Sequence, residues 1–290
     1  SWRSFWAENA PFSLLELARK NGSDTLIPAI PCGNDGRAAG SDGRPIGFTP
    51  SALFTPGNIL EGSFSEEFLD YGAATQDLIA SIIYRDQDDE EVFAVNRTVE
   101  VRRRGVQDSS AVRQTFDLSQ FVTQKQQAIL FGKFLVNQRR FIRKAIQFKT
   151  FPSEAPLEPG GFIYVDIGLK VWDSYSTGLV MEGGALNVPI KDTIANGTYS
   201  FLFYDPKTGA VRSSSHTVTN GVASTASNQA GKMFVMGSEK PSKRVYRITE
   251  VGIEEDGEIS IKALEYPCYN HGGSARAHIA DFRSSLFTVS

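Results

Sequence analysis

The chain has 290 residues, of which 41% are hydrophobic, and its formal net charge at pH 7 is −3. This length allows a sizeable buried core in one large domain or in two. The near-neutral charge excludes a global field that would draw the chain to nucleic acid or to an anionic membrane. The longest apolar run, residues 78–84, is far below the roughly 18 residues that a membrane span requires, so we predict no membrane-spanning segment.

The first elements are predicted from short apolar stretches. Residues 9–20 carry leucine and alanine side chains at helical spacing, and Asn21-Gly22 is a typical helix stop, so we predict the first short helix here. Residues 26–30 indicate a short edge strand, because Pro28 cannot donate a hydrogen bond to a sheet. Residues 33–44 contain two Asp-Gly tips, which we interpret as loop tips.

Strands are predicted next at residues 58–68 and 78–85, where apolar, β-branched and aromatic residues mix. Residues 86–91 form an acidic tip. A clearer strand follows at residues 92–104, in which valines alternate with glutamate and arginines. Because acidic and basic groups lie close in sequence here, we expect residues 99–104 of this strand and the tip to contribute to contacts between subunits.

A central stretch, residues 123–168, organises the middle of the chain. Thr123 is a candidate N-cap, and Gln126 three residues later completes a capping-box pattern, so a second helix is predicted to begin here. Its apolar residues, including Ala128 and Phe131, recur at helical spacing and form one face. That face requires a sheet to cover it.

Two strands are predicted directly after this helix. In residues 139–151 the period changes to two, with Ile146 and Phe148 on one side of the strand. A proline-bounded loop occupies residues 152–159. Residues 162–167 form a nearly continuous apolar run, which is typical of a strand buried on both faces.

The second half is predicted to be almost all β. Its strands are expected at residues 177–182, 198–204, 210–218, 233–236, 243–254 and 259–266. The polar residues 220–231 indicate an exposed loop. Asp256-Gly257 between two β-branched runs is a strong hairpin signal, and residues 287–290 favour a strand.

Cysteine and histidine usage indicates neither a disulfide framework nor a metal site. Cys32 and Cys268 lack metal-ligand spacing, and we expect two free thiols. A metal site at the histidines, His216, His271 and His278, would need further Asp, Glu or Cys ligands converging on them, so we expect these histidines to be solvated or hydrogen-bonded. No metal or other cofactor is predicted.

Motifs with a built-in catalytic mechanism are absent from the sequence: there is no G-x-S-x-G, Walker loop, H-E-x-x-H or C-x-x-C. The acidic residues concentrate in the turns at 88–91 and 254–258, where solvated charge is the ordinary interpretation. Basic groups at residues 102–104 and 139–144 are interpreted as polar faces or subunit contacts, because no aromatic stacking pattern accompanies them. We therefore expect no enzyme activity, no catalytic residue and no specific nucleic-acid binding.

The order of several motifs resembles two groups of bacteriophage proteins. The hub part of phage tail proteins is matched by Phe116-Asp-Leu-Ser-Gln-Phe-Val, by the Gln126-Gln-Ala helix, by Arg139-Arg-Phe-Ile-Arg-Lys-Ala-Ile-Gln-Phe-Lys-Thr and by Pro159-Gly-Gly-Phe-Ile-Tyr-Val. The lambda-type tail tip attachment (host specificity) family is resembled by Gly197-Thr-Tyr-Ser-Phe-Leu, Lys243-Arg-Val-Tyr-Arg-Ile-Thr-Glu-Val and Glu258-Ile-Ser-Ile-Lys-Ala-Leu-Glu-Tyr. The similarity spans roughly residues 117–266.

This resemblance implies an α+β, mainly β fold. Residues 1–152 would form a β-barrel hub-type domain with two short helices, and residues 153–290 an all-β module of antiparallel hairpins that can share strands with the first domain. The family offers no catalytic residues to carry over.

The resemblance also implies a function. It indicates a structural virion protein at the phage tail tip, a homotrimer that closes the tail tube and supports host attachment. Its partners would be the tail tube or distal tail protein and the tip fibres. We expect the chain to be a fragment or a short relative of such proteins. The alternative is a β-rich carbohydrate-binding or adhesin module.

Overall fold

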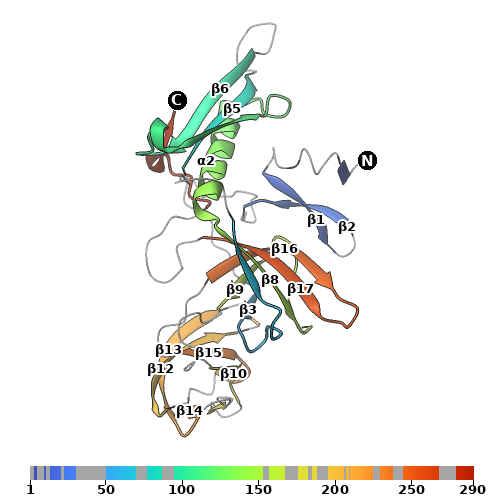
Figure 1. Ribbon diagram of the computed structural model, residues 1–290, viewed down its shortest axis with the longest axis vertical. Helices are drawn as coiled ribbons and strands as arrows, with labels where there is room; N and C mark the ends of the chain where they lie inside the picture. Colours follow the sequence, from blue (N-terminus) through green and yellow to red (C-terminus); the bar gives the residue numbers. More distant parts are fainter. Residues whose placement is uncertain are drawn as a thin grey trace.

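The structure is a computed structural model of residues 1–290, and the description below is confined to part of them. The described residues are 3–4, 10, 14–20, 23–30, 50–69, 77–86, 95–152, 157–166, 176–181, 185–187, 195–205, 207–208, 210–224, 229–237, 244–267 and 279–290. Their strands form four sheets, which are arranged along the long axis of the molecule (Figure 1).

The first sheet is a hairpin that replaces the predicted first helix. Strand β1 (Leu15–Lys20) pairs antiparallel with β2 (Ser23–Pro28), and Lys20 lies opposite Ser23. The helix prediction for residues 9–20 is therefore wrong over β1. Asn21-Gly22 separates the two paired ends, and this dipeptide favours a two-residue hairpin connection at least as strongly as a helix stop. The edge strand predicted at residues 26–30 exists but ends at Pro28.

The central sheet is six-stranded, in the order β3-β9-β16-β17-β8-β4. Its strands are β3 (Ala52–Phe54), β4 (Ser65–Phe68), β8 (Lys144–Thr150), β9 (Phe162–Val165), β16 (Arg244–Ile253) and β17 (Ile259–Glu265). Strand β3 runs parallel to β9, and the other neighbours are antiparallel. The predicted β16–β17 hairpin is confirmed, and Gly257 in its turn has φ +82°.

Both faces of the central sheet are covered. Ile163 and Val165 of β9 lie in a core with Phe148 and Ile261. Phe162, on the other face, packs against a second core, and its ring meets that of Tyr266 at a centroid distance of 4.8 Å. Ile163 and Val165 are buried, whereas Phe162 and Tyr164 on the other face are half-buried, so the prediction that β9 is buried on both faces is confirmed only in part.

The upper sheet is four-stranded, in the order β18-β6-β5-β7. Its strands are β5 (Leu78–Asp86), β6 (Val95–Arg103), β7 (Val112–Asp117) and β18 (Phe287–Val289), and short 3-10 turns at Asp108–Ser110 and Ser284–Leu286 precede β7 and β18. Helix α2 (Lys125–Phe141) covers β5 and β6. Ala128 and Phe131 pack there against Ile82 and Val101, so the predicted apolar face has the predicted partner.

The ends of α2 differ from the prediction. The N-cap is Gln124, no side chain caps the helix, and the Gln124 carbonyl accepts from the N–H of Ala128 at 3.2 Å. Thr123 lies outside the N-cap position, so the capping box does not form. The helix also continues through Phe141 into the predicted strand 139–151, because Arg139 and Arg140 are helix formers that suit the last turn of the helix dipole.

The fourth sheet curls. Its order is β10-β15-β12-β13-β14-β11, and the edge strands β10 and β11 contact each other. Its strands are β10 (Ser176–Leu179), β11 (Ala185–Asn187), β12 (Gly197–Tyr204), β13 (Val211–Thr219), β14 (Val222–Ser224) and β15 (Met233–Gly237). Part of the predicted loop 220–231 is in fact strand β14. Asn220 and Gly221, with φ of +51° and +75°, form the tight turn that joins β13 to β14.

The strand predicted at residues 58–68 is also shorter than expected. Only β4 is a strand there, because the chain turns at Gly62 (φ +76°), and Ile59 contributes a single bridge to Thr150. The sequence analysis did not predict β3, β7 or β11. The mainly β class is confirmed, while the hub-type barrel stays a prediction.

The domain division at 152/153 also stays a prediction. The central sheet takes β3, β4 and β8 from the first part of the chain and β9, β16 and β17 from the second, which is the sharing of strands that the sequence analysis allowed.

Candidate interaction surfaces and cleft

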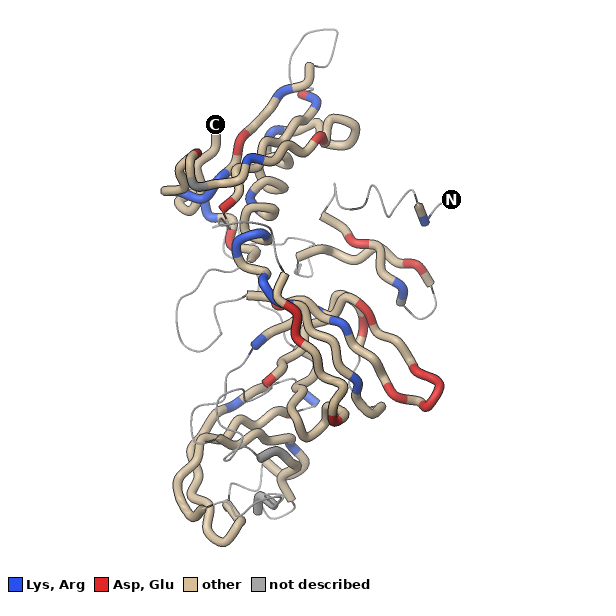
Figure 2. Tube along the Cα trace, viewed as in Figure 1, with Lys and Arg blue, Asp and Glu red and all other residues tan. Residues whose placement is uncertain are grey.

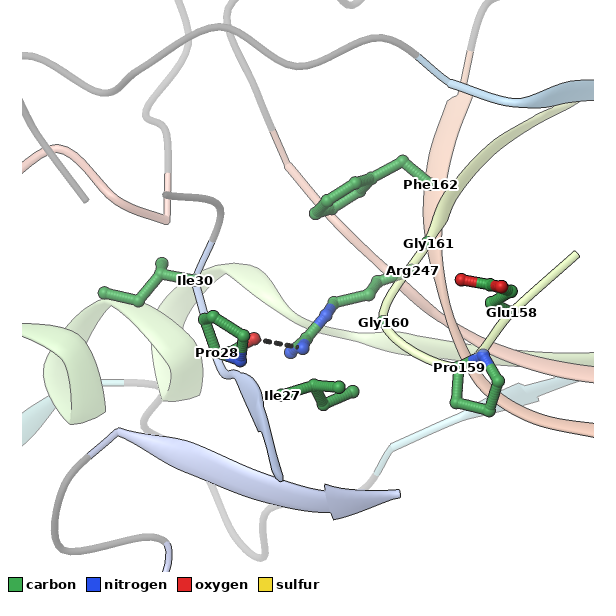
Figure 3. Close-up of a pocket in the computed structure, with 9 residues that line it drawn as sticks. All are labelled: Ile27, Pro28, Ile30, Glu158, Pro159, Gly160, Gly161, Phe162 and Arg247. Carbon is green, nitrogen blue, oxygen red and sulfur yellow. Dashed lines mark hydrogen bonds between the residues drawn. The ribbon is translucent and has the colours of Figure 1, made fainter. Parts of the chain in front are cut away.

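A cleft of about 310 Å³ separates the β1–β2 hairpin from the central sheet (Figure 3). On the hairpin side it is lined by Ile27, Pro28 and Ile30, and on the sheet side by residues 158–162. Arg247 of β16 extends between the two sides, with its guanidinium directed toward Pro28. The lining is mainly apolar, and Arg247 and Glu158 are its charged residues.

Arg247 joins the hairpin to the central sheet. Its Nη1 donates to Glu16 Oε1 at 2.8 Å and to the carbonyl oxygen of Ala29 at 2.7 Å, and its Nη2 donates to the carbonyl oxygen of Pro28. The residue is only 7% exposed. The guanidinium is therefore engaged by the chain itself, and the cleft resembles a structural joint more than an anion-binding pocket.

A buried polar cluster fixes the C-terminal segment, residues 279–290, to α2. The Asn137 side-chain amide donates to the carbonyl oxygens of Ile279 at 2.9 Å and Asp281 at 3.2 Å, and its Oδ1 accepts from Arg103 at 3.0 Å. Lys133 Nζ donates to the carbonyl oxygen of Phe282 at 2.8 Å, and burial lowers the pKa of this lysine. These bonds satisfy polar groups that the core would otherwise leave unpaired.

A second charged cluster lies at one end of the central sheet. Lys144 Nζ and Glu66 Oε1 are 2.5 Å apart, and Arg244 approaches the same carboxylate at 3.8 Å. Burial raises the pKa of Glu265, although Lys144 and Arg244 act in the opposite direction. Burial also raises the pKa of Tyr246, the cross-strand partner of Glu265, to about 12. The cluster is a set of ion pairs on a sheet face.

The expected subunit contact through residues 92–104 is not supported at Arg102. This side chain forms an ion pair with Asp108 of the same chain. Strand β6 is also bordered on both sides within the chain, because β5 pairs with one edge and β18 pairs with the other edge at Val101–Arg103. The charge of Arg102 is therefore matched within the chain, and the contribution of this strand and the acidic tip to subunit contacts stays a prediction.

The other basic group, residues 139–144, is also partly matched within the chain. Arg140 pairs with Asp77, and Lys144 pairs with Glu66. Arg143 is exposed, and its Nε donates to the Arg140 carbonyl oxygen at 3.4 Å. The predicted polar face is present at this junction of α2 and β8 (Figure 2).

His216 is packed and hydrogen-bonded, as expected. Its Nε2 lies 2.8 Å from Ser214 Oγ, and its ring meets Phe201 edge-on at 5.4 Å. Cys32, Cys268, His271 and His278 lie outside the described residues. Within the described part of the chain, no group of three or more His, Cys, Asp or Glu side chains could hold a metal ion.

Sequence reasoning did not single out Arg247 or Asn137. Both are polar residues that directly follow a buried apolar residue in a regular element, Tyr246 before Arg247 and Val136 before Asn137. That mismatch is a usable signal, because a buried polar side chain requires partners. The identity of those partners cannot be read from local sequence.

Comparison with known proteins gives little similarity. No protein family matches the chain, and no curated protein matches its sequence. Among solved structures, a chain of the "Virion of native gene transfer agent (GTA) particle" is similar to 77% of this chain at 13% identity, with a TM-score of 0.37. The matched region is 33% of that solved chain. A TM-score at this level supports no transfer of fold or function.

No helix among the described residues is long and apolar enough to cross a membrane.

Proposed function

We propose that this chain is a structural virion protein, a hub or tip component at the distal end of a bacteriophage tail. The motifs of residues 117–266 that resemble tail hub and tail tip attachment proteins support this proposal. On this proposal the chain assembles as a homotrimer, closes the tail tube, supports host attachment and has no enzyme activity. Its partners are the tail tube or distal tail protein and the tip fibres.

One structural observation favours a role in assembly. Ile253 and Phe151, 83% and 64% exposed, lie at the same end of the central sheet. Lys149, two residues before Phe151, pairs with Glu254, the residue after Ile253, at 3.9 Å. Large apolar side chains with charged residues beside them are typical of surfaces that contact another protein.

The edge strands of the described sheets support the same role. In the described sheets, β7 and β18 border the upper sheet, and β3 and β4 border the central sheet. Strand edges of this kind are usually covered or paired in a working protein. In a ring of copies a neighbouring subunit can supply the cover.

Antibody labelling of purified virions tests the proposal. Antibodies against the chain should label one end of the tail in electron micrographs, and the isolated chain should form three-fold particles. Absence of the label from virions would refute the virion role. Glycan binding by an isolated monomer would instead support the carbohydrate-binding or adhesin alternative.

A further inference from the structure

The β1–β2 hairpin is attached to the molecule differently from every other described strand. It forms a two-stranded sheet of its own, with no described backbone pairing to the central, upper or curled sheet. Figure 1 shows it extending away from the body beside the central sheet. An isolated two-stranded hairpin is at best marginally stable in water, so its order depends on side chains that attach it.

Those attachments fall into two groups. At the base of the hairpin, Leu14, Ala29 and Ile30 pack into the core beneath it, and the N–H of Ala29 donates to the Leu14 carbonyl oxygen at 2.8 Å. Next to the base, Arg247 provides hydrogen bonds to Glu16 of β1 and Pro28 of β2, and a third to Ala29 of the base itself. We call the base, formed by Leu14, Ala29 and Ile30, the hinge of the hairpin. Arg247, which bonds the hairpin to the central sheet, is called the latch.

The cleft lies between these parts. Ile27 and Pro28 face residues 158–162 across about 310 Å³ of space that neither side fills. Close packing exists at one point, where a Cβ added to Gly160 would come 2.6 Å from Ile27 Cδ1. Since interiors normally pack without such gaps, the hairpin rests on the sheet over a small contact area.

The energetic consequence concerns Arg247. Removing one partner of a buried hydrogen-bonded charge leaves its partners unsatisfied, here the carbonyl oxygens of Pro28 and Ala29, whereas the Glu16 side chain is 46% exposed and can be solvated. The central sheet has its own backbone pairing on both sides of β16, so it does not need the hairpin to keep its register.

We propose that the β1–β2 hairpin is a hinged flap, latched by Arg247, that opens as one unit and uncovers the cleft while the central sheet stays folded. Opening breaks the bonds of Arg247 to Glu16 and Pro28 and separates Ile27 and Pro28 from residues 158–162, while the bond to Ala29 stays with the hinge. The hinge at Leu14, Ala29 and Ile30 stays in place. The flap is a conformational device that is independent of the tail function proposed above.

Hydrogen exchange measured by mass spectrometry tests the flap on the whole chain. In the wild-type protein, the amides of β1 and β2 should exchange through a local opening that exposes little surface. The exchange rate of these amides should therefore depend much less on denaturant concentration than the exchange rate of the β16 and β17 amides. In Arg247→Met the hairpin amides should exchange at least tenfold faster, while those of β8, β9 and β17 stay within twofold. Arg247→Lys keeps the charge but has fewer hydrogen-bond donors. Its hairpin amides should exchange at a rate between those of the wild type and Arg247→Met.

Arg244→Met is the matched control. It removes an arginine from the same strand, three residues away, whose contact with Glu66 is 3.8 Å and whose side chain is 40% exposed. It should leave the hairpin amides unchanged. Equal exchange of the hairpin in wild type and Arg247→Met would refute the latch. Exchange of the hairpin and the central sheet by one common opening in the wild type would refute the flap.

Discussion

Gly132 is the residue that lets α2 approach the upper sheet. A Cβ at this position would lie 2.7 Å from Val101 Cγ2 and 2.9 Å from Val101 Cβ. Glycine to alanine inside a helix normally stabilises by about 1 kcal/mol, but overpacking a filled core costs about 1–3 kcal/mol. Because Val101 is in a paired strand and cannot move away freely, the overlap should decide the sign.

We therefore expect Gly132→Ala to lower the free energy of unfolding by roughly 1 kcal/mol, measured by urea denaturation. Gln127→Ala, at an exposed position of the same helix, should change stability by less than about 0.5 kcal/mol. If Gly132→Ala were instead more stable than the wild type, α2 could move slightly away from the upper sheet without a net loss of stability.

Glu265 gives the protein a defined pH dependence. Burial raises the pKa of its carboxyl, so the folded state holds this proton at pH values where the unfolded chain has released it. Between the unfolded and the folded pKa the folded state binds more protons, so this group makes stability fall as pH rises through that window. Above the folded pKa the loss is complete.

Glu265→Gln replaces the carboxyl by an amide that resembles its protonated form. We expect the urea midpoint of this variant at pH 7 to exceed that of the wild type, and the difference to shrink toward pH 4. A parallel pair of midpoint curves across this range would contradict the assignment. Glu67→Gln, at an exposed position of β4, is the control.

At the scale of elements, the C-terminal segment is held to α2 by two polar side chains, Asn137 and Lys133. Asn137 is fully buried and binds Arg103 and the carbonyl oxygens of Ile279 and Asp281. Asn137→Ala leaves those partners unsatisfied, which costs about 1–3 kcal/mol for each buried group that finds no water. We expect a total loss of about 3 kcal/mol in urea unfolding.

Hydrogen exchange locates the effect of Asn137→Ala. The amides of β18 and of its neighbour β6 should lose protection, while β12 and β15 of the curled sheet should keep theirs. If β18 kept its protection, Lys133 and the pairing with β6 would suffice to hold the segment.

Local patterns predicted several elements well. Valines at positions 99 and 101 are buried and the intervening Glu100 is not, as the alternation in residues 92–104 predicts. Asp256-Gly257 correctly placed the β16–β17 turn, because few backbone conformations suit that dipeptide other than a tight turn. In these elements local preference and tertiary environment agree.

Elements that depend on distant partners were missed or misread. The leucine spacing of residues 14–18 fits a helix, but β1 finds backbone partners in β2, and Glu16 finds Arg247. Strand β7 (Val112–Asp117) is exposed along most of its length, so it lacks the apolar alternation that marks a strand, and its parallel pairing with β5 determines its conformation.

At the scale of the whole molecule, β12 connects two cores through opposite faces. Leu202 packs with Leu53 of β3 and Val235, at the junction of the curled and central sheets. Phe203, the next residue, faces the interior of the curled sheet with Phe234. Leu202 therefore packs the curled sheet against the central sheet, whereas the adjacent Phe203 contributes only to packing inside the curled sheet.

Two alanine substitutions should separate these roles. Leu202→Ala should cost about 2–5 kcal/mol and reduce hydrogen-exchange protection in β3 as well as in the curled sheet. Phe203→Ala should cost about 3–5 kcal/mol but leave β3 protected. Equal effects of both variants on β3 would mean that the two sheets unfold as one cooperative unit.

The cleft could not be predicted from the sequence, because its lining comes from distant parts of the chain. Its two sides come from residues 27–30 and 158–162, and Arg247 lies between them. No local pattern records contacts across more than 200 positions, whereas the sequence could indicate that Arg247, flanked by apolar residues, needs partners.

The position of the latch, Arg247, also affects how the hairpin folds during synthesis on the ribosome. Glu16 and Arg247 are 231 positions apart, so at synthesis rates of about 5–20 residues per second the hairpin waits on the order of 10–50 s for its partner. During that interval the nascent hairpin cannot rely on its own stability. Ribosome-associated chaperones and proteases should therefore meet this segment in an open state before the rest of the chain has been made.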